Sequence, residues 1–153
     1  MKPAARAALV AAGVIATDQA VKALVRSTIE RGDAVDLFLG IQLVNVRNRG
    51  IAFGMFSGGG ILLVLFAVAA LVALLVFFAR HRDRPLVWLP TGLLIGGATG
   101  NLIDRTREGA VTDWFDLPYW PAFNVADVAI TFGVLTLLYV LEGPPRHAAA
   151  GRT

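Results

Sequence analysis

Two aspartates in the last third of the chain, Asp113 and Asp127, are the residues best placed for hydrolytic chemistry. Asp127 follows Asn124 by three residues, about one helical turn, at the start of an apolar segment. It therefore lies about 4.5 Å further along the helix axis, at ~1.5 Å per residue. Asp113 lies in the connection that leads back to this segment, so the two carboxylates can meet. Adjacent carboxylates share a proton, and such a pair can activate water and protonate a carbonyl oxygen. The spacing alone also allows Asp113 to be a loop acid and Asp127 to cap or pack its helix.

Other hydrolytic machinery has little support. There are no cysteines, which excludes disulfides and thiolate metal sites. Two histidines, His81 and His147, are too few for a His-rich zinc site. The four-helix membrane arrangement argued below also places both on the opposite side from the acids. Ser57 and Thr112 therefore have no base histidine to activate them. We predict a mechanism that needs no metal and no cofactor.

Further polar residues stand at the same ends of the apolar segments, where lipid makes polar groups costly. Asp18 and Lys22 are four residues apart with the acid first, which is a favourable helical pair. Asp104 and Arg105 follow Asn101 at spacings of three and four, which predicts a shared helix face. Asp104 and Arg105 also fit plain interfacial charges, so their spacing leaves this role open.

The composition indicates that these residues are held by membrane helices. The 153 residues are 56% apolar and 16% charged, with a mean hydropathy of +0.66. Soluble domains usually carry about 25% charged residues, and a membrane span needs about 20 mostly apolar residues. We predict four spans, at about residues 4–25, 61–79, 86–105 and 124–142. The first is the weakest, because Asp18 and Lys22 interrupt it.

The first segment also has features of a cleaved signal peptide. It begins with Lys2 and Arg6, and its apolar run has a suitable length. However, no good Ala-x-Ala cleavage site precedes Asp18, and the pairing of Asp18 with Lys22 suits a retained helix. We therefore interpret it as a span.

The predicted fold is an all-α membrane protein, a bundle of four transmembrane helices with a small extracytoplasmic β-hairpin or β-platform between the first two. The β-prone runs Val35–Leu39 and Ile41–Val46 flank Gly40, which predicts the hairpin. A glycine at every fourth position from 92 to 100 predicts close helix packing. Aromatic residues between the third and fourth spans predict a belt at headgroup level; they are Trp114, Phe115, Tyr119, Trp120 and Phe123.

The charge distribution predicts the orientation. Four spans leave both termini on one side, together with the short basic turn Arg80–Pro85. That side holds seven basic residues against six on the other, and the density in the turn favours cytoplasmic termini. The basic residues lie between apolar runs rather than on one polar face, unlike those of a nucleic-acid binder.

We predict one domain over residues 1–142, with its site at the outer face, and a disordered cytoplasmic tail at 143–153.

Five stretches of the sequence resemble the lipoprotein signal peptidase family, also called signal peptidase II. They are Thr17–Lys22 (TDQAVK), Asn48–Gly54 (NRGIAFG), Gly96–Arg105 (GGATGNLIDR), Gly109–Trp114 (GAVTDW) and Pro121–Asp127 (PAFNVAD). Each is weak alone, but their order, separations and four-span layout match together over roughly residues 7–142. Two departures are Trp114, where Phe or Met is common, and Thr112, where Val is common.

The resemblance implies a bacterial inner-membrane aspartic endopeptidase. Such enzymes remove the signal peptide from prolipoproteins, cutting before a cysteine that already carries diacylglycerol. The implied partners are these substrates and membrane lipid, with no nucleic acid and no metal. The resemblance makes Asp113 and Asp127 the catalytic pair. The resemblance also implies residues that line the substrate groove, namely Asn48, Asn101, Arg105 and Asn124. The polar residues that it implies as support for the site are Asp18, Lys22 and Asp104.

Two other classes of protein remain possible on the residues alone. A small proton-coupled transporter or channel subunit would use Asp18, Asp104 and Asp127 as a proton relay. A membrane chaperone of lipoproteins would need no catalytic acid. Relay acids should be spread through the membrane depth, whereas these cluster at one end, which favours chemistry at the surface.

Overall fold

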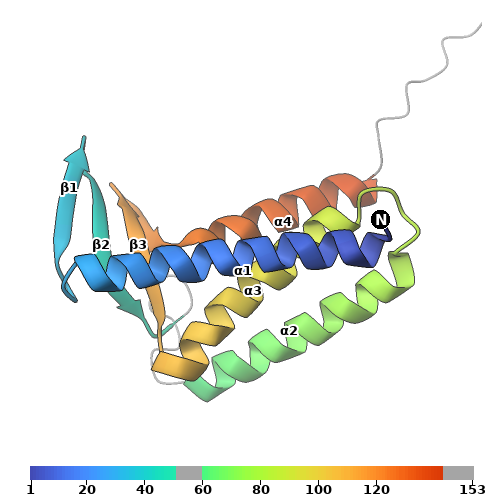
Figure 1. Ribbon diagram of the computed structural model, residues 1–153, viewed down its shortest axis with the longest axis horizontal. Coiled ribbons are helices and arrows are strands. Elements are labelled where there is room, and N and C mark those ends of the chain that lie inside the picture. The colour runs from blue at the N-terminus through green and yellow to red at the C-terminus, as the bar shows by residue number, and fades with distance from the viewer. Residues whose placement is uncertain (51–59, 143–153) are drawn as a thin grey trace, which may run out of the picture.

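The computed structural model describes residues 1–50 and 60–142, which form four helices and four strands. The helices are α1 (Pro3–Thr28), α2 (Gly60–His81), α3 (Trp88–Glu108) and α4 (Val125–Glu142). The strands are β1 (Ala34–Phe38), β2 (Ile41–Asn48), β3 (Val111–Leu117) and β4 (Trp120–Phe123). The sheet lies at one end of the helices (Figure 1). Ser57, His147 and the predicted tail lie outside the described residues.

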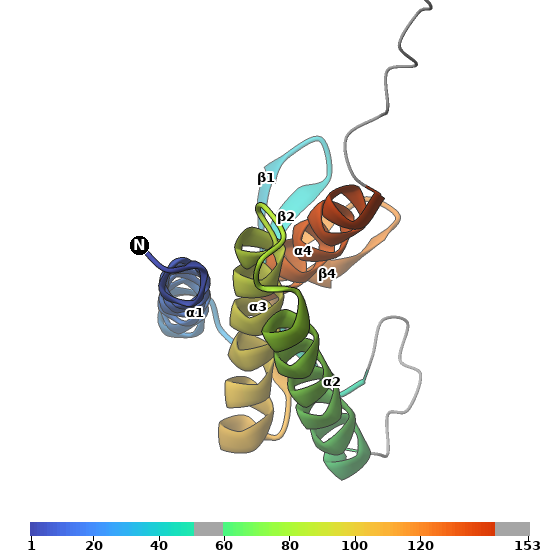
Figure 2. The same ribbon diagram turned by 90° about the vertical axis from the view of Figure 1, so that its right-hand side faces the viewer.

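Helix α3 is the centre of the bundle. It contacts the other three helices, and Figure 2 shows it between α1 on one side and α2 and α4 on the other. Its glycines allow this packing. A Cβ added to Gly96 would lie 2.7 Å from Cβ of Val14 on α1, and one added to Gly97 would lie 2.5 Å from the carbonyl oxygen of Ala126 on α4. A Cβ cannot approach another heavy atom this closely, and Gly92 meets α1 in the same way as Gly96, so the predicted glycine stripe is confirmed as a helix contact surface.

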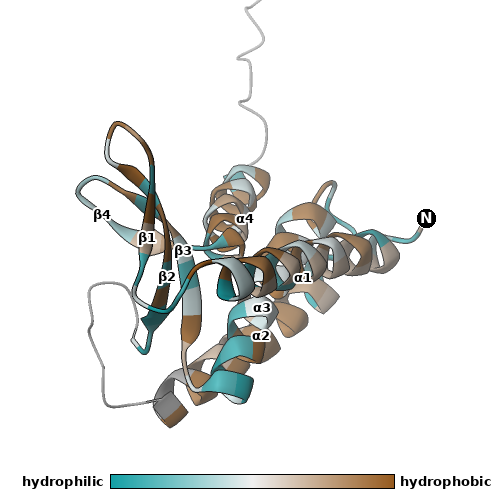
Figure 3. Cartoon of the chain, turned by 60° about the vertical axis from the view of Figure 1, so that its left-hand side comes forward, coloured by the Kyte–Doolittle hydropathy of each residue, from teal (hydrophilic) through white to brown (hydrophobic). Residues whose placement is uncertain are grey.

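The outer surfaces of the helices are suited to lipid. Large apolar side chains such as Leu65 on α2 and Leu135 on α4 are exposed, and apolar residues recur along the helices in Figure 3. By length and composition α1, α2 and α4 are apolar enough to cross a membrane. Backbone polar groups within lipid must be satisfied internally, and helices achieve this.

Two helices differ from the predicted spans in apolar character or in extent. Among the described helices, α3 is not apolar enough to count as a span by the same measure, and it runs from Trp88 to Glu108 rather than over residues 86–105. Helix α1, predicted as the weakest span, meets the measure. The place of α3 between the other helices explains why it is less apolar than they are. The three neighbours of α3 shield it, so it can carry glycines and polar side chains at lower cost than a helix facing lipid.

The sheet is larger than the predicted hairpin. Strands β1 and β2 form that hairpin around Gly40, whose φ of 80° favours glycine. The connection predicted only as an aromatic belt instead contains β3 and β4, and the antiparallel sheet has the order β1-β2-β3-β4. Phe115 and Phe123 pack edge to face across these strands, with ring centroids 5.4 Å apart. Strand β3, which carries Asp113 and pairs with β2, lies where α1 and α3 end and α4 begins (Figure 1).

Candidate active site

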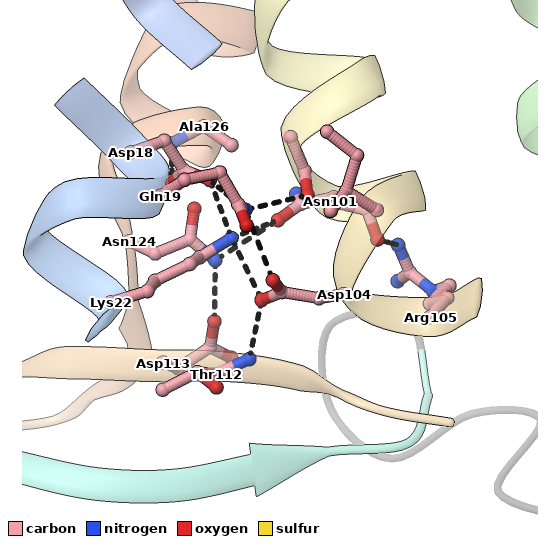
Figure 4. Close-up of polar contacts among 12 residues, drawn as sticks. Asp18, Gln19, Lys22, Asn101, Asp104, Arg105, Thr112, Asp113, Asn124 and Ala126 are labelled. Atoms are coloured by element: carbon pink, nitrogen blue, oxygen red, sulfur yellow. Dashed lines mark hydrogen bonds and ion pairs between the residues drawn. The ribbon is translucent and has the colours of Figure 1, made fainter. Parts of the chain in front are cut away.

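The structure brings all the predicted site residues together at this end of the bundle. Helices α1 and α3 and the start of α4 provide most of them, and β2 and β3 provide the rest (Figure 4). Six are buried: Asp18, Lys22, Asn101, Asp104, Asp113 and Asn124. Three are half-buried: Asn48, Arg105 and Asp127.

At the centre of this polar cluster is the ammonium group of Lys22, which is fully buried. Its Nζ lies 2.8 Å from Oδ2 of Asp18 and 3.1 Å from Oδ2 of Asp104, and it donates a 3.0 Å hydrogen bond to Oδ1 of Asn101. A buried charge is tolerated when it is paired and hydrogen-bonded. The predicted pairing of Asp18 with Lys22 is confirmed, and Asp104 adds a second carboxylate from α3.

The two partner carboxylates tie this charge to the elements that carry the candidate pair. Oδ1 of Asp18 accepts a 2.9 Å hydrogen bond from the backbone N–H of Ala126 in the first turn of α4. Oδ2 of Asp104 accepts a 3.1 Å hydrogen bond from the backbone N–H of Thr112, directly before Asp113. The ion cluster therefore fixes the start of α4 and the start of β3 relative to α1 and α3 (Figure 4).

Gln19 belongs to the same cluster, although its role there is not evident from the sequence. Its side-chain amide donates to Oδ1 of Asp104 at 3.0 Å and to the carbonyl oxygen of Gly100 at 3.2 Å. The only signal for it is its place beside Asp18 in the Thr17–Lys22 stretch.

Asp127 has a structural role at the start of α4 in addition to its place in the site. Asn124 precedes the helix, and its Oδ1 accepts a 3.0 Å hydrogen bond from the N–H of Asp127. In return, Oδ2 of Asp127 accepts a 3.2 Å hydrogen bond from the N–H of Asn124. This reciprocal arrangement is a capping box. The simpler interpretation of Asp127 as a helix cap is thus correct, and it is compatible with a catalytic role.

The four carboxylate oxygens of the candidate pair each accept an N–H. Oδ1 and Oδ2 of Asp113 accept from the side-chain amides of Asn124 (2.7 Å) and Asn48 (2.9 Å). Oδ1 of Asp127 accepts from the amide of Asn101 at 2.8 Å, and Oδ2 is held by the capping box. Among the described residues no hydrogen bond joins the two carboxylates directly; Asn124 bonds to both.

The orientations of the three asparagine amides are fixed by their oxygens. Oδ1 of Asn101 faces the Lys22 ammonium, Oδ1 of Asn124 accepts from a backbone N–H, and Oδ1 of Asn48 accepts from the N–H of Gly50 at 2.9 Å. An ammonium or a backbone N–H can only donate, so each of these oxygens must remain the acceptor. Every amide NH₂ is therefore directed toward a carboxylate.

Burial raises the pKa of Asp113 to about 6. The amide donors of Asn48 and Asn124 act in the opposite direction because they favour the ionised form, while the nearby charge of Asp127 raises the pKa further. A carboxyl group that titrates this close to neutrality can hold and release a proton during a reaction.

Both acids line one cavity of about 880 Å³. Its polar end is formed by the acids with Asn48, Asn101 and Arg105, and its remaining lining is largely apolar and comes mainly from α2, β4 and α4. Asp104 and Asn101 both bond to Lys22 on α1, whereas Arg105 lines the cavity together with Asn101. The predicted shared face therefore holds for Asn101 with each of the other two but not for Asp104 with Arg105. Residues 104 and 105 are neighbours on the helix, and a step of about 100° directs them toward different partners.

The described residues contain no group of three or more His, Cys, Asp and Glu side chains arranged to hold a metal ion. His81 stacks on Phe77 near the end of α2, and its Nδ1 lies 2.9 Å from the carbonyl oxygen of Phe77. What the arrangement provides is a pair of oriented carboxylates at the end of an apolar cavity, which is suited to acid–base chemistry on a substrate with a long apolar part.

Replacing Lys22 by Met should lower the free energy of unfolding by about 3–5 kcal/mol, because it leaves two buried carboxylates without their counterion. The matched control is Lys2→Met, since Lys2 is exposed before α1. Thermal unfolding in detergent should show a large loss for Lys22→Met and little change for Lys2→Met. Equal melting temperatures for the two variants would show that the buried charge does not organise the fold.

Comparison with known proteins identifies the family. The family model described as Signal peptidase (SPase) II matches residues 10–142. The lipoprotein signal peptidase of Halothermothrix orenii is 40% identical over 129 residues, which cover 84% of this chain and 89% of the relative. The lipoprotein signal peptidase of Moorella thermoacetica is 40% identical over 140 residues, covering 89% of this chain and 92% of the relative.

Two solved structures, each described as a bacterial membrane enzyme, have the same fold. One gives a TM-score of 0.85 at 29% identity and covers 96% of this chain and 93% of its own. The other gives 0.80 at 31% identity, with 88% and 91% covered. The sequence match and the shared fold together show that this chain belongs to the signal peptidase II family of membrane peptidases.

Proposed function

We propose that this protein is an aspartic endopeptidase that removes the signal peptide from prolipoproteins, cutting before a diacylglyceryl-modified cysteine. The observation that carries the proposal is the pair Asp113 and Asp127, whose oxygens are held by oriented N–H groups and which both line one apolar cavity. Membership of the signal peptidase II family supports the reaction and the class of substrate.

In the proposed reaction the pair begins with one proton, which we place on Asp113. Asp127 takes a proton from water, the water oxygen bonds to the scissile carbonyl carbon, and Asp113 donates its proton to the carbonyl oxygen. The C–N bond then breaks, Asp127 passes its proton to the leaving amine, and Asp113 recovers a proton from the hydroxyl as the carbonyl re-forms. Water is consumed and both acids return to their starting states.

The cavity supports a substrate that is part peptide and part lipid. Among the described residues, Arg105 makes only long hydrogen bonds, 3.4 Å to the carbonyl oxygen of Asn101 and 3.5 Å to that of Gly50. A guanidinium can form a stronger, charge-assisted hydrogen bond with a substrate carbonyl. The apolar lining from α2 and α4 suits the signal peptide and acyl chains. Each buried CH₂ of a diacylglyceryl group contributes about 0.8 kcal/mol to membrane anchoring. This anchoring would hold the cleavage site at the depth of the acids.

We further propose that residues 1–142 form a single peptidase domain whose four helices all cross the inner membrane, with both termini cytoplasmic and the site at the outer face. The central place of α3 supports a fourth crossing, because its neighbours shield its polar residues from lipid. Reporter fusions at Gly32, before β1, and at Arg82, after α2, should give opposite signals for the two sides of the membrane. Identical signals would contradict this arrangement.

The substrate proposal is tested with the purified protein and one prolipoprotein prepared with and without its diacylglyceryl group. Only the modified form should release its signal peptide at an appreciable rate, since only this form is anchored at the depth of the acids. Addition of a chelator should leave the rate unchanged, because the proposed chemistry uses carboxylates alone. Equal cleavage of the two forms would reject the lipid requirement, and inhibition by chelator that added metal reverses would reject the metal-free mechanism.

A further inference from the structure

Beside the candidate pair lies a second group of charges, formed by Arg26, Arg47 and Glu108, which we call the Arg–Glu–Arg clasp. Arg26 is in the last turn of α1, Arg47 is near the end of β2, and Glu108 is the last residue of α3. The side chains are between a quarter and a third exposed, so the clasp lies at the edge of the protein rather than in its core.

The carboxylate of Glu108 joins the two arginines. Its Oε1 lies 3.6 Å from Nε of Arg26, and its Oε2 pairs with Nη2 of Arg47. Arg47 also donates a 3.1 Å hydrogen bond to the backbone carbonyl oxygen of Glu108. The clasp therefore connects the ends of α1, β2 and α3 at the point where the chain turns through Gly109 into β3.

The position of Glu108 is not explained by its own helix. A negative charge at the C-terminal end of a helix is unfavourable, because the partial charge of the helix dipole there is also negative. The two arginines offset this cost. A residue that breaks a local rule and is compensated by partners on other elements is expected where the site requires it.

Thr112 connects the clasp to the candidate pair. Nη1 of Arg26 donates a 3.1 Å hydrogen bond to Oγ1 of Thr112, which is buried and directly precedes Asp113. Thr112 also faces Arg47 across the pairing of β2 with β3. A valine at this position would have no oxygen to accept this bond, so the link depends on the hydroxyl of Thr112.

We propose that Arg26, Arg47 and Glu108 are positioning residues that act through the Thr112 hydroxyl to fix Asp113 against Asp127. This inference rests on the proposed function. Arg26 holds Thr112 from α1 while the backbone N–H of Thr112 is held by Asp104, so the residue before Asp113 is restrained at two points. A small displacement of a catalytic group is sufficient to slow a reaction strongly.

The test measures kcat, KM and thermal unfolding of Thr112→Val, Thr112→Ser and Arg26→Met. Thr112→Val keeps the shape of the side chain and removes the acceptor, so kcat per folded enzyme should fall by about tenfold with little change in KM. Thr112→Ser keeps the acceptor and should retain most of the activity. Arg26→Met should resemble Thr112→Val, and the double variant should be no slower than the slower single variant, because both changes remove the same bond.

The matched control is Arg107→Met, since Arg107 neighbours Glu108 but is exposed. This variant should keep the kcat of the unmodified enzyme. Two results would overturn the proposal: a kcat for Thr112→Val within about twofold of normal, or a double variant whose loss is the product of the two single losses. Asp113→Asn, assayed in parallel, separates the two claims. If it is inactive while Thr112→Val is normal, the clasp proposal alone fails, whereas an active Asp113→Asn rejects the catalytic pair itself.

Discussion

The pairing of one buried ammonium with two carboxylates is the interaction on which the rest of this structure depends. Lys22 is fully buried, and its charge is compensated by Asp18 from its own helix and Asp104 from α3. These carboxylates also accept backbone N–H groups at the starts of α4 and β3, through Oδ1 of Asp18 and Oδ2 of Asp104. Because an unpaired charge at this depth would be very costly, the four elements can meet in few other ways. The same ammonium orients the amide of Asn101 and so reaches Asp127 through one further hydrogen bond.

This constraint explains how a membrane bundle can hold two acids ready for chemistry. Asparagine amides and one backbone N–H occupy all four carboxylate oxygens. Turning any of these amides over would place its NH₂ against an ammonium or a backbone N–H, neither of which can accept a hydrogen bond. Burial raises the pKa of Asp113, so the pair can retain a proton near neutral pH. The glycines of α3 have a complementary role, because they let α1 and α4 approach closely enough for these short bonds to form. Preorganised polar groups of this kind are characteristic of catalytic sites.

Much of the site was predictable because its signals are local. The spacing of Asp18 and Lys22, the repeated glycines and the β-prone runs each depend on a single element, and a helical or strand period describes one element well. Contacts between distant segments were not predictable in the same way. The pairing of β3 with β2, the bond from Gln19 to Asp104 and the convergence of two arginines on Glu108 depend on which elements become neighbours. The weak hydropathy of α3 has the same origin, because shielding by three helices is a property of the assembled bundle.

The central claim is that Asp113 and Asp127 act as one catalytic unit, and it is tested most directly by signal-peptide release from a diacylglyceryl-modified prolipoprotein. Asp113→Asn and Asp127→Asn each remove a proton carrier, whereas Asp116→Asn, on the same strand as Asp113 but three residues beyond it, provides the matched control. We expect both pair variants to insert and fold but to lose nearly all activity, by about a thousandfold or more, while Asp116→Asn stays active. A folded Asp113→Asn or Asp127→Asn variant that cleaves the substrate at a rate near that of the unmodified enzyme would contradict this claim.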